Sequence, residues 1–210
     1  MSDPSAPILP AANGYELGVR RILSPRAEIS AAWWLLDLES EFVWVGDEGV
    51  TDAGGATRRH GLELEARWRM SSSLWAEVDV TASRGRYRET GELIARAPRL
   101  TFNTAAVLSD WSGWSGQLRV RHVGDHQAVE DGSVKAAGFT VADLHLRRRL
   151  SENWDGLASI ENLFNTSFRE AQTFYPSRLA SEPLAVDDIH FTPGNPRALR
   201  IGVEYRFAWR

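Results

Sequence analysis

The 210-residue chain contains no cysteine, and Lys135 is the only lysine among its 24 basic residues. The absence of cysteine excludes a disulfide scaffold and any zinc site built from thiolates. No window approaches the ~18 consecutive apolar residues of a membrane-spanning helix, so a helical membrane protein is excluded. A net charge of −4 gives no indication of nucleic-acid binding. Residues 1–13 have neither the basic start nor the apolar run of a signal peptide.

The clearest pattern lies at the end of the chain. The sequence Pro-Gly-Asn-Pro at 193–196 predicts a tight loop. Residues 198–207 then alternate, which in a strand places apolar and polar side chains on opposite faces. The apolar face carries Leu199, Ile201, Val203, Tyr205 and Phe207, and the other carries Ala198, Arg200, Gly202, Glu204 and Arg206. A tilted strand needs roughly 9–11 residues to cross a bilayer, so this segment is long enough to be transmembrane.

The same alternation predicts eight strands upstream. They are residues 13–23, 28–45, 59–70, 74–88, 99–108, 116–124, 138–150 and 154–164. The strand at 28–45 departs from the pattern, because Trp34, Leu36 and Leu38 make its second face apolar too and leave its register open. No segment shows a convincing 3.6-residue period, so no helix is expected.

The predicted connections alternate between short and long. Short turns follow the first, third, fifth and seventh strands, and long polar loops follow the second, fourth, sixth and eighth. Outer-membrane barrels sort their connections in this way, with short turns in the periplasm and long loops outside. Aromatic residues near strand ends fit two interfacial girdles; these are Trp44, Trp68, Trp75, Trp111, Trp114, Trp154 and Phe207. The predicted fold is all-β: a segment of an antiparallel up-and-down transmembrane β-barrel.

Nine strands are an odd number, whereas single-chain bacterial barrels have an even number because both ends lie in the periplasm. We therefore expect a partial barrel, the tail of a larger one. Residues 1–13 are expected to be a lead-in, 14–207 the C-terminal barrel strands, and 208–210 a tail.

Seven short motifs occur in an order that resembles the C-terminal part of TonB-dependent outer-membrane receptors. They are Tyr15-Glu16-Leu17-Gly18-Val19-Arg20, Arg59-His60-Gly61-Leu62-Glu63-Leu64-Glu65, Ala97-Pro98-Arg99, Arg121-His122-Val123-Gly124, Phe139-Thr140-Val141-Ala142-Asp143-Leu144, Ile160-Glu161-Asn162-Leu163-Phe164-Asn165 and Pro193-Gly194-Asn195-Pro196-Arg197. The chain departs from the family pattern by running three residues past Phe207, the expected terminal aromatic.

The resemblance implies a receptor that imports a scarce small molecule, such as a ferric siderophore, across the bacterial outer membrane. It implies four partners: outer-membrane lipid, the remainder of the barrel with its plug domain, the TonB complex acting through that plug, and the small-molecule ligand. No cofactor and no enzymatic activity are expected. The alternatives are a small stand-alone outer-membrane barrel of structural or adhesive role, and a soluble β-protein. An isolated partial barrel predicts that its first and last strands do not pair.

Candidate binding residues fall into two groups, and the sequence identifies no ligand. Five arginines on polar faces suit anionic ligand groups or, alternatively, a solvated lumen; these are Arg119, Arg121, Arg147, Arg200 and Arg206. The loop 168–193 carries residues suited to ligand contact, namely Phe174, Tyr175, Asp187, Asp188 and His190.

Metal-binding and catalytic sites are not expected. His60, His122, His126, His145 and His190 lack metal-ligand spacing. Ser159 and His145 lie on neighbouring predicted strands, where a lipase-type pair is possible, but no G-x-S-x-G motif is present and His145 is expected to face the lumen. Glu63 and Glu65 share a face, as on any lumen-facing strand.

Overall fold

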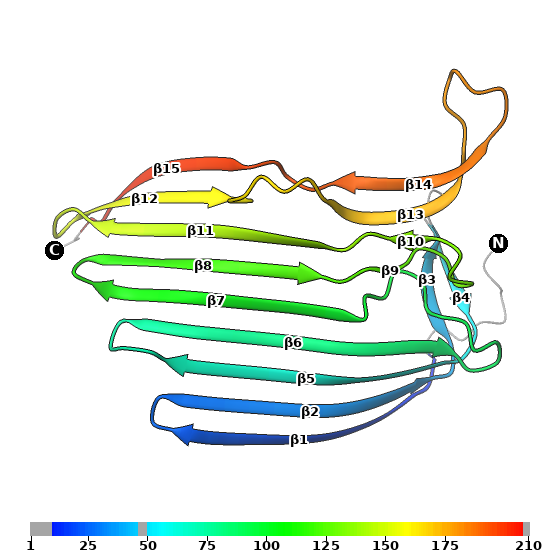
Figure 1. The fold of residues 1–210 in the computed structure, drawn as a ribbon, viewed down its shortest axis with the longest axis horizontal. Coiled ribbons are helices and arrows are strands. Elements are labelled where there is room, and N and C mark those ends of the chain that lie inside the picture. Colours follow the sequence, from blue (N-terminus) through cyan, green and yellow to red (C-terminus); the bar gives the residue numbers. More distant parts are fainter. Residues whose placement is uncertain (1–9, 46–49, 208–210) are drawn as a thin grey trace.

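The computed structural model describes residues 10–45 and 50–207. The tail at 208–210, the side chain of Trp44 and residues 46–49 of the expected loop lie outside the described residues. Nine strands form one sheet (Figure 1). In sheet order they are β1 (Ala12–Ser24), β2 (Ala27–Leu38), β5 (Thr57–Arg69), β6 (Leu74–Tyr87), β7 (Leu100–Trp111), β8 (Trp114–Val123), β11 (Phe139–Arg149), β12 (Trp154–Glu161) and β15 (Ala198–Tyr205).

Every neighbouring pair in this sheet is antiparallel, which confirms the predicted up-and-down order. β1 and β15 are the two edges, and they are not paired with each other. The described strands therefore form an open section of a barrel, as the odd strand count predicted. No helix in the described part of the chain has the length and apolar character to span a membrane.

Three smaller hairpins lie at one end of the sheet, opposite the short turns (Figure 1). They are β3 (Glu41–Val45) with β4 (Val50–Gly54), β9 (His126–Gln127) with β10 (Lys135–Ala136), and β13 (Arg169–Ser177) with β14 (Val186–Pro193). The predicted single strand 28–45 is wrong: the chain leaves the large sheet after Leu38, and residues 41–45 pair with β4. The long loops predicted around 125–137 and 166–195 contain the other two hairpins.

The strand register collects apolar side chains on one face of the whole sheet. One row crosses eight strands through Ala27, Trp68, Ala76, Ala106, Leu118, Leu144, Ile160 and Leu199. The apolar residues of β15 on this face are strongly exposed, with Ile201 at 79%. Alternation places the charged residues on the opposite face. The neighbouring row, shifted by one residue on each strand, is charged except at Ala105; it runs through Glu28, Arg67, Glu77, Ala105, Arg119 and Asp143.

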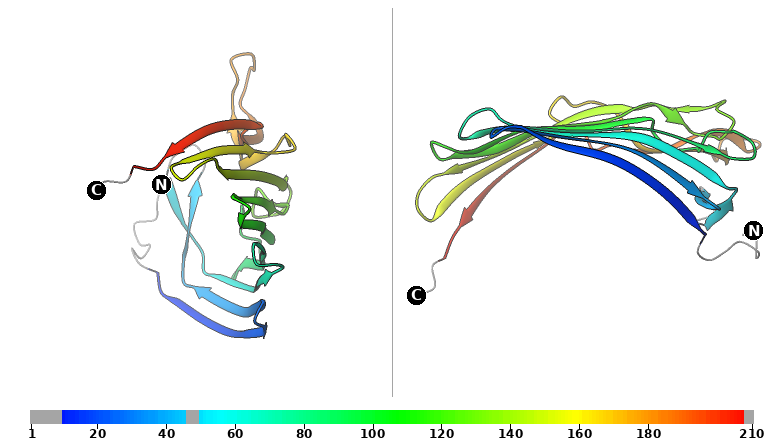
Figure 2. Two further views of the ribbon diagram at one scale, coloured as in Figure 1. Left: turned by 90° about the vertical axis from the view of Figure 1, so that its left-hand side faces the viewer. Right: turned by 90° about the horizontal axis from the view of Figure 1, so that it is seen from below.

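The charged face is the concave one. Viewed along the strands, the sheet curves round an open side, and the β3–β4 hairpin crosses that side (Figure 2). At the start of this hairpin, Glu41 accepts a hydrogen bond of 2.8 Å from Thr57 Oγ1 and forms an ion pair with Arg59. Thr57 and Arg59 alternate with the apolar side chains of β5, so they mark the charged face as the one that the hairpin covers.

The uncertain register of β2 is settled by its pairing with β5. Trp33 lies opposite Leu62 on the convex face and is 43% exposed. Trp34 lies on the concave face, over Gly61; a Cβ at Gly61 would stand 2.7 Å from its ring. Apolar residues on the concave face are possible here because the loops fold back over this end of the sheet. Their packing forms a small core that includes Tyr87, Ile94, Ala128, Ala136, Phe139 and Val141.

The junction between β12 and β15 depends on one buried side chain. Asn162 is 4% exposed, and its amide Nδ2 donates to the carbonyls of Thr166 (2.8 Å) and Asn195 (2.9 Å). Its Oδ1 accepts from the backbone N–H of Thr166 at 2.8 Å. The side chain thus ties the end of β12 to the loop that precedes β15. This gives a physical role to the first asparagine of the Asn-Leu-Phe-Asn motif.

The sequence predicts two aromatic girdles, one at each end of the strands. In the structure, the predicted aromatic residues gather mainly at the end with the short turns. Trp68, Trp111, Trp114, Trp154 and Phe207 are exposed near the short turns. Trp75 does not join them on the convex face: its register places it on the concave face, where the Arg69 guanidinium lies 4.4 Å from its ring centre.

Candidate ligand-binding surface

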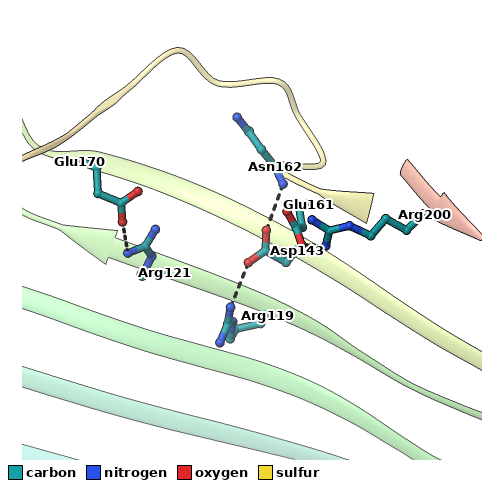
Figure 3. A network of polar contacts seen from close by, with 7 residues as sticks. All are labelled: Arg119, Arg121, Asp143, Glu161, Asn162, Glu170 and Arg200. Atoms are coloured by element: carbon teal, nitrogen blue, oxygen red, sulfur yellow. Dashed lines mark hydrogen bonds and ion pairs between the residues drawn. The ribbon is translucent and has the colours of Figure 1, made fainter. Parts of the chain in front are cut away.

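The concave face carries a lattice of ion pairs around β8, β11 and β12 (Figure 3). Arg119 Nη2 donates to Asp143 Oδ2 at 3.1 Å, and the backbone N–H of Asn162 donates to Asp143 Oδ1 at 3.0 Å. Arg121 Nη1 donates to Glu170 Oε1 at 3.0 Å. These bonds join β8, β11, the residue that follows β12 and the start of β13.

The lattice continues on β12 and β15. Arg200 forms an ion pair with Glu161. Asp155, which is 1% exposed, accepts from Arg147 at 2.5 Å and from Arg206 at 2.8 Å. All five arginines proposed from the sequence as anion-binding residues are therefore neutralised by carboxylates of this chain. Their arrangement favours the alternative interpretation, a charged wall facing water.

A pocket of about 230 Å³ lies at the loop end of the concave face. Its walls come from β2, β5 and β6, from the segment before β7, and from the β9–β10 hairpin; among its lining residues are Trp34, Arg59, Ile94, Arg99, Gln127 and Lys135. Arg59 is paired with Glu41. Within the described residues, Arg99 and Lys135 have no ion-pair or hydrogen-bond partner for their side chains.

Two buried polar atoms of this pocket lack partners among the described residues. They are Trp34 Nε1, a donor, and Gln127 Oε1, an acceptor. Buried polar groups are normally hydrogen-bonded, so unpaired ones at a pocket wall indicate a place where a ligand or water completes the bonding. The lining also contains the Asp125 carboxylate, which accepts from the backbone N–H of Gly138. Two unpaired cations and a free donor outweigh this one carboxylate and favour an anionic, oxygen-rich group.

Loop contacts hold the pocket in shape. The missing side chain of Gly85 leaves room for Ile94, whose Cδ1 would lie 2.5 Å from a Cβ at that position. The Tyr87 hydroxyl donates to Glu130 at 2.8 Å, which ties the β9–β10 loop to the end of β6. In the same loop, the N–H and hydroxyl of Ser133 donate to Asp131 at 2.9 and 2.7 Å. These bonds lower the pKa of Asp131 below its ordinary value.

The five histidines are dispersed. His122 Nδ1 lies 2.8 Å from Thr140 Oγ1, His126 lines the pocket, and His190 stacks on Tyr175 at 3.8 Å. His60 is exposed on the convex face. The described residues contain no group of three or more metal-binding side chains. His145 and Ser159 are register partners, and no hydrogen bond joins their side chains in the described part of the chain.

The proposed loop residues lie on the β13–β14 hairpin, which projects beyond the sheet (Figure 1). Phe174 is opposite Ile189, and Tyr175 is opposite Asp188. Apolar side chains are exposed towards the hairpin tip, with Leu179 at 65% and Leu184 at 75%. The hairpin is thus a separate surface from the pocket, and the structure does not bring the two together into one site.

Sequence reasoning did not identify Arg99, Lys135, Trp34 or Gln127 as neighbours. They come from four segments that meet only because the loops fold back onto the concave face. The one available signal was Trp34, an apolar residue on the face that is otherwise charged.

The comparisons agree with this fold. The family described as "TonB dependent receptor-like, beta-barrel" matches residues 11–163. Curated protein sequences give no match. Among solved structures, the ferric yersiniabactin uptake receptor FyuA of Yersinia pestis is similar at 20% identity and a TM-score of 0.71, over 94% of this chain and 30% of that one.

Two further structures show the same likeness. The ferric-catecholate import receptor Fiu of E. coli K12 has 22% identity and a TM-score of 0.69, over 93% of this chain and 27% of that one. The ferric citrate transporter FecA has 16% identity and a TM-score of 0.69, over 92% and 31%. The chain spans about 30% of the length of these structures. From the match over residues 11–163, the chain belongs to the family of TonB-dependent receptor β-barrels.

Proposed function

We propose that the chain forms part of the wall of an outer-membrane receptor that imports a scarce anionic metal chelate, such as a ferric siderophore. The observation that carries the proposal is the division of one nine-stranded sheet into an apolar convex face and an ion-paired concave face. In a membrane, the convex face would contact lipid tails and the concave face would contact water and a plug.

The pocket at the loop end supports an anionic substrate. Arg99 and Lys135 supply positive charge, and Trp34 Nε1 supplies a hydrogen-bond donor. At about 230 Å³ the pocket is below the ≈ 300–1,000 Å³ of typical small-molecule sites. It would therefore be one contact region of a larger site, completed by other parts of the receptor. The similar structures include receptors for ferric chelates and a copper transporter, which is consistent with a metal-containing substrate.

The partners follow from the same proposal. The open edges of β1 and β15 would pair with the remainder of the barrel, because unpaired backbone groups are costly in lipid. The plug would lie against the concave face and connect the receptor to the TonB complex. A small stand-alone outer-membrane barrel is less well supported, since β1 and β15 do not pair.

Uptake measurements test the proposal. Cells that carry the intact gene are given radiolabelled ferric citrate or a ferric catecholate under iron limitation. The R99Q/K135Q variant is expected to lower uptake at least tenfold at limiting substrate, because a hydrogen bond to a charged group contributes ~1.5–3 kcal/mol. The R67Q/R69Q variant, which loses the same amount of charge on the concave face near the short turns, serves as the matched control. Unchanged uptake in R99Q/K135Q would exclude the pocket as a substrate contact.

A further inference from the structure

A second basic surface lies on the opposite, convex face of β5 and β6. Along these strands the apolar rows end at Leu62, which pairs with Ala82. The next row on the same face pairs His60 with Arg84, and the row after that pairs Arg58 with Arg86. The convex face thus changes from apolar to basic between one row of side chains and the next.

The residues of this surface line a hollow of about 280 Å³. We call it the convex basic patch; it comprises Arg58, His60, Arg84, Arg86 and Arg88. All five are exposed.

Most of the positive charge in the convex basic patch is unbalanced. Arg58 forms two hydrogen bonds to Asp37, at 2.7 and 2.8 Å. Arg86 donates to the backbone carbonyl of Gly91, which carries no charge. Within the described residues, the side chains of Arg84 and Arg88 have no hydrogen-bond or ion-pair partner. Asp37, already bonded to Arg58, attracts Arg88 through space and is one carboxylate for two guanidinium groups. This contrasts with the concave face, where all five of the arginines named above have carboxylate partners.

The surroundings of the patch place it at the border of the apolar band. Trp33 is register partner to Leu62 in the last apolar row, and it is 43% exposed. Tyr15, 67% exposed, is aligned through Leu35 with His60. Tryptophan and tyrosine favour the interface between lipid tails and water, so these residues mark the level at which headgroups would begin.

We propose that the convex basic patch binds the phosphate groups of an anionic lipid in the surrounding membrane leaflet. The inference rests on the proposed membrane location of the chain. Guanidinium groups form bidentate hydrogen bonds with phosphate. Adjacent rows of the sheet bring several guanidinium groups within reach of one lipid headgroup. The acyl chains of the same lipid would lie along the apolar rows below. A lipid therefore satisfies both the charge of the patch and the hydrophobicity of the neighbouring rows.

The test uses the full chain in neutral detergent micelles, with binding of diphosphoryl lipid A counted by native mass spectrometry. The R84Q/R88Q variant is expected to bind about 30-fold more weakly, since a basic residue near a membrane surface contributes ~1 kcal/mol. The R67Q/R69Q variant, with the same loss of charge on the concave face, is expected to bind like the unchanged chain. Asp37→Asn, which frees Arg58, is expected to strengthen binding.

Further probes separate the possible outcomes. The monophosphorylated form of the lipid should bind more weakly and phosphatidylcholine should show no preference for the patch. Inorganic phosphate should not displace the lipid, because it lacks acyl chains; full displacement would assign the patch to free phosphate and overturn the proposal. Equal binding by R84Q/R88Q and R67Q/R69Q would also overturn it. A chain that remains monomeric without detergent would instead contradict the membrane location itself.

Discussion

A charge placed at the middle of the convex face should be far more harmful than one placed beside it on the concave face. Leu64 lies on β5 between its register partners Ala31 and Val80. It is four residues from Trp68 and four from His60, which at ~3.3 Å per residue is ~13 Å in each direction. At the ≈ 35–45° tilt of barrel strands, this ~26 Å path covers ~20 Å of membrane depth, which fits within the ≈ 25 Å apolar band of outer-membrane barrels with Leu64 at its centre.

Leu64→Arg is therefore expected to lower the free energy of unfolding from phospholipid vesicles by about 2–4 kcal/mol, the cost of arginine at the bilayer midplane. Glu63→Arg, at the adjacent concave position, is expected to cost less than ~1 kcal/mol because its side chain stays in water. Both values come from urea titrations followed by tryptophan fluorescence. Similar costs for the two variants would refute the assignment of the faces.

Three further predictions concern the contacts that shape the sheet. Gly61→Ala forces a methyl group against the Trp34 ring and is expected to cost about 1–3 kcal/mol, seen as a lower urea midpoint; a midpoint equal to that of the unchanged chain would contradict it. Asn162→Ala removes three hydrogen bonds and is expected to cost about 3 kcal/mol and to expose the connection before β15 to protease. Ser133→Ala is expected to return the pKa of Asp131 towards its ordinary value of 3.8, measured by NMR titration. Because the pKa is lowered in the folded chain, this turn is most stable above the ordinary value and loses its stabilisation as the pH falls through the lowered one.

Most of the large sheet could be predicted from the sequence, because period-two alternation determines both strand length and face. β5 and β15 are the clearest cases: every second residue is apolar, and the register aligns these residues with apolar ones on the next strand. β2 was ambiguous since Trp34 and Leu36 break the alternation. The reason is now clear: folded-back loops cover this end of the concave face and give apolar side chains a place there.

The small hairpins and the pocket could not be predicted in the same way. β3 continues the apolar pattern of β2, so the sequence does not show that the chain leaves the sheet after Leu38. The redirection depends on contacts made by distant residues, such as that of Glu41 with Thr57. The sequence also does not show which carboxylate pairs with each arginine of the concave face. Polar alternation identifies Arg119 as concave, but only the register with β11 supplies its partner Asp143.

The most direct measurement is the water accessibility of alternate residues along β15. Since the chain has no cysteine, a single one can be introduced at each position from 199 to 204 without background. In phospholipid vesicles, a membrane-impermeant maleimide is expected to label positions 200, 202 and 204 rapidly and to leave 199, 201 and 203 unmodified. Equal labelling of the two sets would contradict the assignment of the convex face to the membrane. Protection of positions 199, 201 and 203 in protein prepared without lipid would contradict it too.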